Sequence, residues 1–201
     1  LRTSVQEYYN EDFFRKSQLK KSTTFDKNGA KLSESSVTYH IADAQSGAVI
    51  PSNQLSLPQM DTKSVFIAPK EERERVYEQS DYLEKKTEKH YDRVGNIVKY
   101  IDHGAGKPSD KIEADIRYYE SATPYFGGIA QSIIVKDANG EVRKREADIH
   151  PQTAEIIKIR QFSGVGIYTE TQLSYDEYGN LIQVTGAENE KGQRSQINYQ
   201  Y

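Results

Sequence analysis

One short word, Asp-x-x-Gly, recurs between runs of strand-like residues and constrains the fold of this chain more than any other feature. Its four copies begin at Asp26, Asp92, Asp137 and Asp176, and their glycines are Gly29, Gly95, Gly140 and Gly179. An Asp that opens a turn accepts hydrogen bonds from nearby backbone N–H groups, and Gly adopts positive φ without a steric clash. Each copy therefore predicts a tight turn between two strands, and the recurrence indicates a repeat architecture.

The word is longer in two of its copies. Tyr91 and Asn96 flank the second copy, and Tyr175 and Asn180 flank the fourth, so that both read Tyr-Asp-x-x-Gly-Asn. Phe25 takes the place of the Tyr in the first copy, and a Lys does so in the third. Because such turns fix which residues of two strands face each other, we expect these residues to set the register of the hairpins. They are the candidate site residues of the chain.

The long word, followed by an aliphatic run, resembles the repeat of the Rhs/YD-repeat proteins. These include shell-forming parts of bacterial Tc-type toxin complexes, Rhs toxins and the animal teneurins. The phrases HYDRVGNIVKYIDHG and LSYDEYGNLIQVTGAENEKGQRSQINYQY look like their units, and the resemblance covers most of residues 17–201. It implies a β shell that encloses a toxic C-terminal polypeptide or presents a surface to a partner cell. It also implies a secreted or cell-surface location.

The composition favours an all-β fold. Tyr accounts for 15 residues, against 6 Phe and no Trp, and hydrophobic residues make up only 35% of the 201 residues. Tyr and β-branched residues suit half-buried sheet faces, and a net charge of only −3 is unlike the strongly charged composition of a disordered chain. We expect antiparallel hairpins in a meander, with residues 1–201 forming a single YD-repeat module that is a fragment of a larger β shell.

Three stretches carry separate expectations. Residues 44–64 contain Pro51 and Pro58, which cannot donate to a strand ladder, so we expect a loop excursion there. Residues 1–16 fit either a short helix or a strand. The charged run KEERERVYEQSDYLEKKTEKHY has helix-favouring composition, but its apolar residues form no helical stripe, and we expect two strands. We expect Gly192 to lie in a longer loop that tolerates substitution.

No motif for catalysis, metal binding or cofactor binding stands out. The chain has no Cys, and its four histidines (His40, His90, His103 and His150) lack the spacing of a zinc site. The openings of the first and third words resemble a calcium loop only in their first residues, because the later oxygen ligands are missing. Basic residues are dispersed and the pI is about 5.9, which argues against nucleic-acid binding. We expect no cofactor, no membrane span and no catalysis.

Three functional hypotheses remain from the sequence. The first is a structural shell segment whose partners are neighbouring YD repeats and an enclosed toxin domain. The second is a carbohydrate-binding or adhesion module, because Tyr-rich sheet faces suit sugar stacking. The third, an excised enzyme domain, is disfavoured by the missing motifs. The first residue is not Met and the last is the Tyr that precedes Asp in a YD word, so we expect a piece of a longer protein. We also expect weak edge-strand self-association through residues 196–201.

Overall fold

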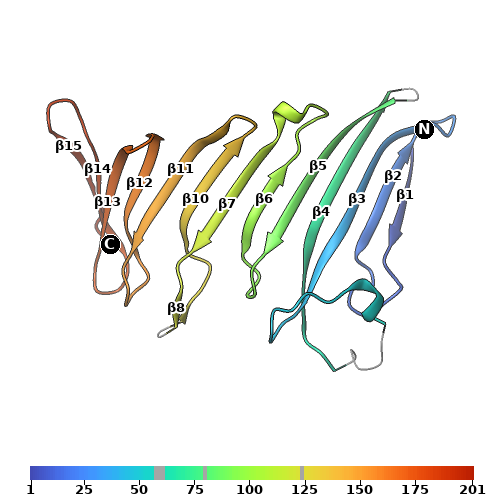
Figure 1. Ribbon diagram of the computed structural model, residues 1–201, viewed down its shortest axis with the longest axis horizontal. Helices are drawn as coiled ribbons and strands as arrows, with labels where there is room; N and C mark the ends of the chain where they lie inside the picture. The colour runs from blue at the N-terminus through green and yellow to red at the C-terminus, as the bar shows by residue number, and fades with distance from the viewer. Residues whose placement is uncertain (57–61, 79–80, 123–124) are drawn as a thin grey trace. The chain divides into compact units, whose positions relative to one another are not determined.

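The computed structural model describes residues 1–56, 62–78, 81–122 and 125–201. Figure 1 shows a succession of antiparallel strands joined by hairpin turns. The described residues contain no α-helix, and two 3-10 turns, η1 (Ser52–Gln54) and η3 (Pro108–Asp110), complete the regular structure. No helix in these ranges is long and apolar enough to span a lipid bilayer. The expected fold class, an all-β meander of antiparallel hairpins, is confirmed.

The chain forms two compact units, Leu1–Glu113 and Ala114–Tyr201, with the boundary inside β7 (Ile112–Tyr118). Unit 1 contains β1 (Thr3–Tyr8), β2 (Leu19–Phe25), β3 (Lys31–Asp43), β4 (Val65–Glu78), β5 (Asp81–Tyr91) and β6 (Ile97–Asp102). Unit 2 contains β8 (Ser121–Ala122), β9 (Tyr125–Phe126), β10 (Ala130–Asp137), β11 (Gly140–Ile149), β12 (Ile156–Gly164), β13 (Ile167–Tyr175), β14 (Leu181–Glu188) and β15 (Arg194–Asn198). A single module over residues 1–201 stays a prediction.

Within each unit the strand order follows the chain. In unit 1, each of β1 to β5 pairs antiparallel with the strand that comes next. In unit 2 the same holds from β10 to β15, while β8 and β9 pair only with each other as a small hairpin. Residues 1–16, left open between helix and strand, contribute β1.

The charged run lies in two strands, as expected: residues 70–78 belong to β4 and residues 81–91 form β5. Arg75 faces Glu84 across this strand pair, and Glu74 faces Lys85. Opposite charges on facing strand positions stabilise a sheet in the way that i,i+4 pairs stabilise a helix. The same alternation of charge that suits a helix therefore supports a hairpin here.

Few apolar side chains are buried among the described residues. Those below a tenth exposed are Tyr9, Ile41, Ala42, Leu55, Ile101 and Ala147, and Leu55 is the most buried at 2%. The chain after β3 turns back on that strand: the Ile50 N–H donates to the Ile41 carbonyl (2.9 Å), and Ala42 bridges to Val49. Unit 1 therefore holds a small core where residues 44–56 return to β3, and the sheet elsewhere is a thin layer.

Candidate functional site

Three copies of the Asp word form the same turn. The N–H of Asp26, Asp92 and Asp176 donates to the carbonyl four residues on, at 2.9, 2.9 and 3.0 Å. The glycine N–H donates back to the Asp carbonyl at 3.2, 3.3 and 3.1 Å, and the three glycines have φ of +83, +93 and +84°. These bonds close a three-residue hairpin loop in which a residue at positive φ follows a β-turn. The turns join β2 to β3, β5 to β6 and β13 to β14.

The Asp carboxylate binds the backbone of the turn and the Asn residue that ends the motif. Asp92 Oδ1 accepts from the backbone N–H of Val94 and of Asn96, each at 2.9 Å. Asp92 Oδ2 accepts from the Asn96 side-chain amide at 3.0 Å. Asp176 repeats the pattern, with its Oδ2 2.9 Å from Asn180 Nδ2, and this amide is the main cause that lowers the pKa of Asp176. The carboxylate therefore serves the turn itself.

The Tyr of the word attaches its strand to the preceding one. The Tyr91 hydroxyl donates to the Pro69 carbonyl of β4 at 2.6 Å, and the Tyr175 hydroxyl donates to the Ile156 carbonyl of β12 at 3.0 Å. Burial raises the pKa of both phenols. A Phe cannot donate this bond, so the first copy lacks it.

The third copy differs from the others. Asp137 and Gly140 face each other as paired strand residues, which leaves a two-residue loop of Ala138 and Asn139. The Asp137 carboxylate accepts from the Asn139 N–H at 2.7 Å, and Gly140 has φ of +122°. This copy, which lacks the aromatic residue, closes β10 on β11 by a shorter connection.

One further turn of the same kind opens with Asn in place of Asp, in a stretch where the sequence indicates a turn but carries no copy of the Asp word. The Asn189 N–H donates to the Gln193 carbonyl (2.8 Å), and Asn189 Oδ1 accepts from the N–H groups of Lys191 and Gln193, both at 2.9 Å. Gly192 has φ of +74°, so the expectation of a loose loop there was wrong. An Asn amide oxygen replaces the carboxylate oxygen in this turn. A search for Asx-x-x-Gly would have found it.

A turn of another kind follows β11, at His150-Pro151-Gln152, where the sequence also indicates a connection between two strands. His150 Nδ1 lies 3.2 Å from the Thr153 N–H and 3.4 Å from the Gln152 N–H. Ala154 takes the left-handed conformation, with φ of +62°. The equivalent turn after β3 uses Asp43 as acceptor and Gly47 at φ of +73°. No Asp or Gly marks the His150 turn, so the sequence word could not reveal it.

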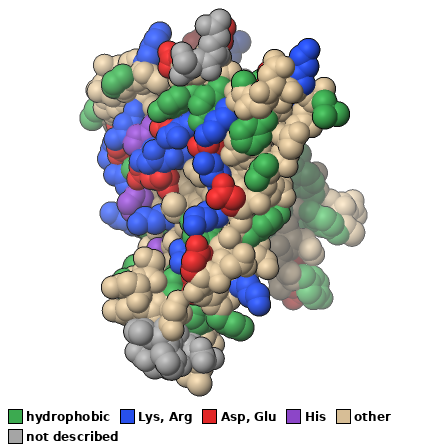
Figure 2. Space-filling model, turned by 90° about the vertical axis from the view of Figure 1, so that its right-hand side faces the viewer, with side chains coloured by type: hydrophobic (Ala, Val, Ile, Leu, Met, Phe, Trp, Pro, Cys, Tyr) green, Lys and Arg blue, Asp and Glu red, His purple; other side chains and the backbone are tan. Residues whose placement is uncertain are grey.

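One face of unit 1 carries an ion-pair network across its strands. Glu34 of β3 contacts Lys21 at 3.0 Å, Lys31 at 2.9 Å and Arg75 at 3.4 Å, and Arg75 contacts Glu84 of β5 at 2.7 Å. The hydrogen bond from Lys31 lowers the pKa of Glu34 in spite of its burial. Figure 2 shows acidic and basic side chains interleaved over one side of the surface in view. The acidic and basic side chains of this face therefore neutralise one another within the unit.

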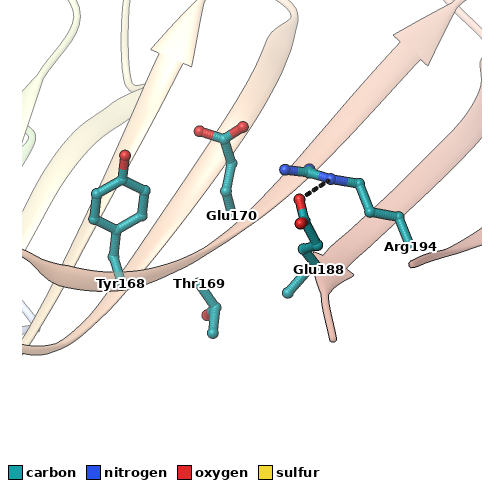
Figure 3. Close-up of a pocket in the computed structure, with 6 residues that line it drawn as sticks. Tyr168, Thr169, Glu170, Glu188 and Arg194 are labelled. Atoms are coloured by element: carbon teal, nitrogen blue, oxygen red, sulfur yellow. Dashed lines mark ion pairs between the residues drawn. The ribbon is translucent and has the colours of Figure 1, made fainter. Parts of the chain in front are cut away.

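Unit 2 has a comparable polar face. Arg160 of β12 binds both carboxylate oxygens of Asp148, at 3.0 and 2.6 Å, and lies 3.4 Å from Glu170 of β13. A shallow hollow of about 360 Å³ lies over β13 to β15, lined by Tyr168, Glu170, Glu188 and Arg194 among others. Figure 3 shows the Tyr168 and Glu170 side chains on the same side of β13, and the ion pair between Glu188 and Arg194.

The four histidines do not form one cluster, and they differ in their partners. His103 Nε2 is 2.8 Å from Glu88 Oε1, His150 belongs to its turn, and His40 lies among aromatic rings near His90. Within the described ranges, no three His, Asp or Glu side chains gather closely enough to hold a metal ion. The turns can fix the register of neighbouring strands, and the polar faces can form hydrogen bonds with a partner molecule.

Comparison with known proteins rests on structure. No family model matches the sequence, and no curated protein matches it significantly. The structure of the Photorhabdus luminescens Tc holotoxin pore is similar with a TM-score of 0.51 at 10% identity, over 88% of this chain and 14% of that one. A crystal structure of TcdB2-TccC3-TEV matches over 92% of this chain and 9% of that one, with 16% identity and a TM-score of 0.39. The chain thus spans a small part of these two proteins. The fold predicted from the Asp words is confirmed: over most of its length this chain has a fold similar to part of the Tc holotoxin pore structure.

Proposed function

We propose that this chain is a wall segment of a β shell that encloses a toxic C-terminal polypeptide and performs no catalysis of its own. One observation carries the proposal: within each unit the strands follow one another as a meander, and few side chains of the described residues are buried, which suits a wall better than a globular domain. The likeness of fold to the Tc holotoxin pore supports it. Its partners are then neighbouring YD repeats and the enclosed chain, in a secreted or cell-surface protein.

In this role the turns keep each hairpin in register, and the ion-pair faces keep the wall soluble and rigid. A single exposed ion pair contributes only about 0–1 kcal/mol, but a network shares the entropy cost of ordering its side chains. Glu34 contacts three cations at once, so its ordering serves three pairs. The wall is thereby held by polar contacts where a globular domain would use an apolar core.

Protease protection of the full-length natural protein tests this function. We expect an enclosed polypeptide that resists protease in the wild type and becomes digestible in Asp92→Ala, which removes the acceptor of the turn. Asp92→Asn is the matched control, because Asn189 forms the same turn with an amide oxygen. Absence of any protected polypeptide in the wild type would refute containment.

A second candidate, carbohydrate binding, has one specific observation in its favour. Tyr168 is 47% exposed and lines the hollow of Figure 3 with Glu170 and Arg194, and such a mixture of an aromatic ring and polar groups can bind a sugar. Hydrogen bonding from Gln172 is the main cause that lowers the pKa of Glu170, which keeps that carboxylate an acceptor. A glycan array separates the two functions: saturable binding lost in Tyr168→Ala but kept in Tyr82→Ala, a tyrosine also 47% exposed, would favour the sugar site.

A further inference from the structure

Three rings from three adjacent strands meet beside the Asp92 turn. The ring centroid of His40 (β3) lies 5.2 Å from that of Tyr91 (β5) and 6.0 Å from that of Phe66 (β4). The Phe66 and Tyr91 rings are 5.5 Å apart and nearly perpendicular. Phe66 also lies against the turn, because a Cβ on Gly95 would be 2.8 Å from its ring. The His40 imidazole is thus packed where β3, β4, β5 and the turn meet.

The surroundings of His40 disfavour protonation of its imidazole. Half-burial is the main cause that lowers its pKa, and Lys70 of β4 and His90 of β5 lower it further. The Tyr91 hydroxyl is already engaged with a β4 carbonyl. The carboxylate of Asp43, further along β3, accepts from its own turn and from a lysine.

On the side of the Asp92 turn, the charged side chain of Arg93 contacts Gly47, where any Cβ would overlap it. Arg93 is a cation, so it offers no counter-charge to an imidazolium. A protonated His40 would therefore sit half-buried among aromatic rings with Lys70 as a cationic neighbour, and removing a charge from water is costly.

We propose that His40 is an acid-sensitive latch: protonation of its imidazole disrupts the ring cluster and loosens the Asp92 turn from β4. An unperturbed His titrates near pH 6.5. The unfolded chain gains the proton more readily than the folded one, so the stability from the neutral latch is complete above about pH 6.5 and is lost as the pH falls below it. The inference rests on the ring cluster and does not depend on the shell function.

Hydrogen exchange of the whole chain at pH 7.5 and pH 5.5 tests the latch. The readout is the protection factor of the Asp92 and Asn96 amides, corrected for the intrinsic pH dependence of exchange. Between pH 7.5 and pH 5.5, we expect the protection factor in the wild type to fall. The fall should be about tenfold for each pKa unit by which folding lowers the pKa of His40. His40→Phe keeps a ring without a titrating group and should abolish this extra loss.

A second variant and a control complete the design. His40→Gln is neutral and polar, and it carries the test if His40→Phe does not fold. His103→Gln is the matched control, because His103 has Glu88 as an anionic partner at 2.8 Å and should leave the pH dependence of the turn unchanged. The latch is overturned if both His40 variants keep the wild-type pH dependence, or if His103→Gln removes it.

Discussion

Two glycines in the same kind of turn and in the same unit allow backbone strain to be separated from steric overlap. Gly29 and Gly95 have φ of +83 and +93°, and each follows an Asp-opened turn. A Cβ on Gly29 would meet nothing within 4 Å, whereas one on Gly95 would lie 2.8 Å from the Phe66 ring. We therefore compare Gly29→Ala with Gly95→Ala.

The expected magnitudes follow from these geometries. An Ala held at positive φ costs about 1–2 kcal/mol, and overpacking a filled site adds about 1–3 kcal/mol. Gly29→Ala should therefore lose about 1–2 kcal/mol of unfolding free energy, and Gly95→Ala about 2–5 kcal/mol. The Phe66 ring cannot swing aside freely, because it contacts the rings of His40 and Tyr91.

Urea denaturation followed by circular dichroism measures both losses, provided the m-values stay equal. Adding Phe66→Leu to each glycine variant completes a double-mutant cycle. The smaller side chain should recover part of the loss in Gly95→Ala and none in Gly29→Ala. Equal losses in the two single variants would refute the reasoning, because strain alone would then account for both.

Three further predictions concern the turns and the carboxylates. Asn180→Ala removes the amide that donates to Asp176 and should lower the free energy of unfolding by about 1 kcal/mol in urea denaturation. Ala30→Asn adds the same amide to the first turn and should raise that free energy by about the same amount. Gly192→Ala should cost as much as Gly179→Ala, about 1–2 kcal/mol, since both glycines have positive φ; a cost confined to Gly179 would contradict the turn seen at residues 189–193. Hydrogen bonds from two lysines lower the pKa of Glu113 from 4.5 to about 2, so its contribution to stability is present above about pH 4.5 and is lost as the pH falls toward 2. Thermal melts over this range should show a smaller acid loss in Glu113→Gln than in the wild type.

The sequence predicted best those parts of the structure whose chemistry is local. The turn at Asp92 closes through groups within four residues of the Asp, so its letters alone indicate the hairpin. At His150 and the left-handed Ala154 other residue types close the turn; the sequence indicates a connection at His150-Pro151-Gln152 but not these two roles. The burial of Leu55 depends on how residues 44–56 return to β3, which is a tertiary property that loop composition does not encode.

The polar faces were predictable only in part. Glu, Lys and Arg recur along the strand sequences, but the partners of Glu34 lie on three different strands. Which cations meet depends on the register between strands, and a bulge such as that between Thr38 and Tyr39 shifts the register within a single pair.

The chain-ordered strands also bear on how the protein is made. Each strand of unit 1 from β2 to β6 pairs with the strand synthesised just before it, so no pairing waits for a distant segment. Topologies rich in such local pairings fold rapidly, because little loop-closure entropy precedes each contact. A hairpin can therefore add to the growing sheet as soon as its second strand leaves the ribosome, and translation itself sets the order in which the sheet is assembled.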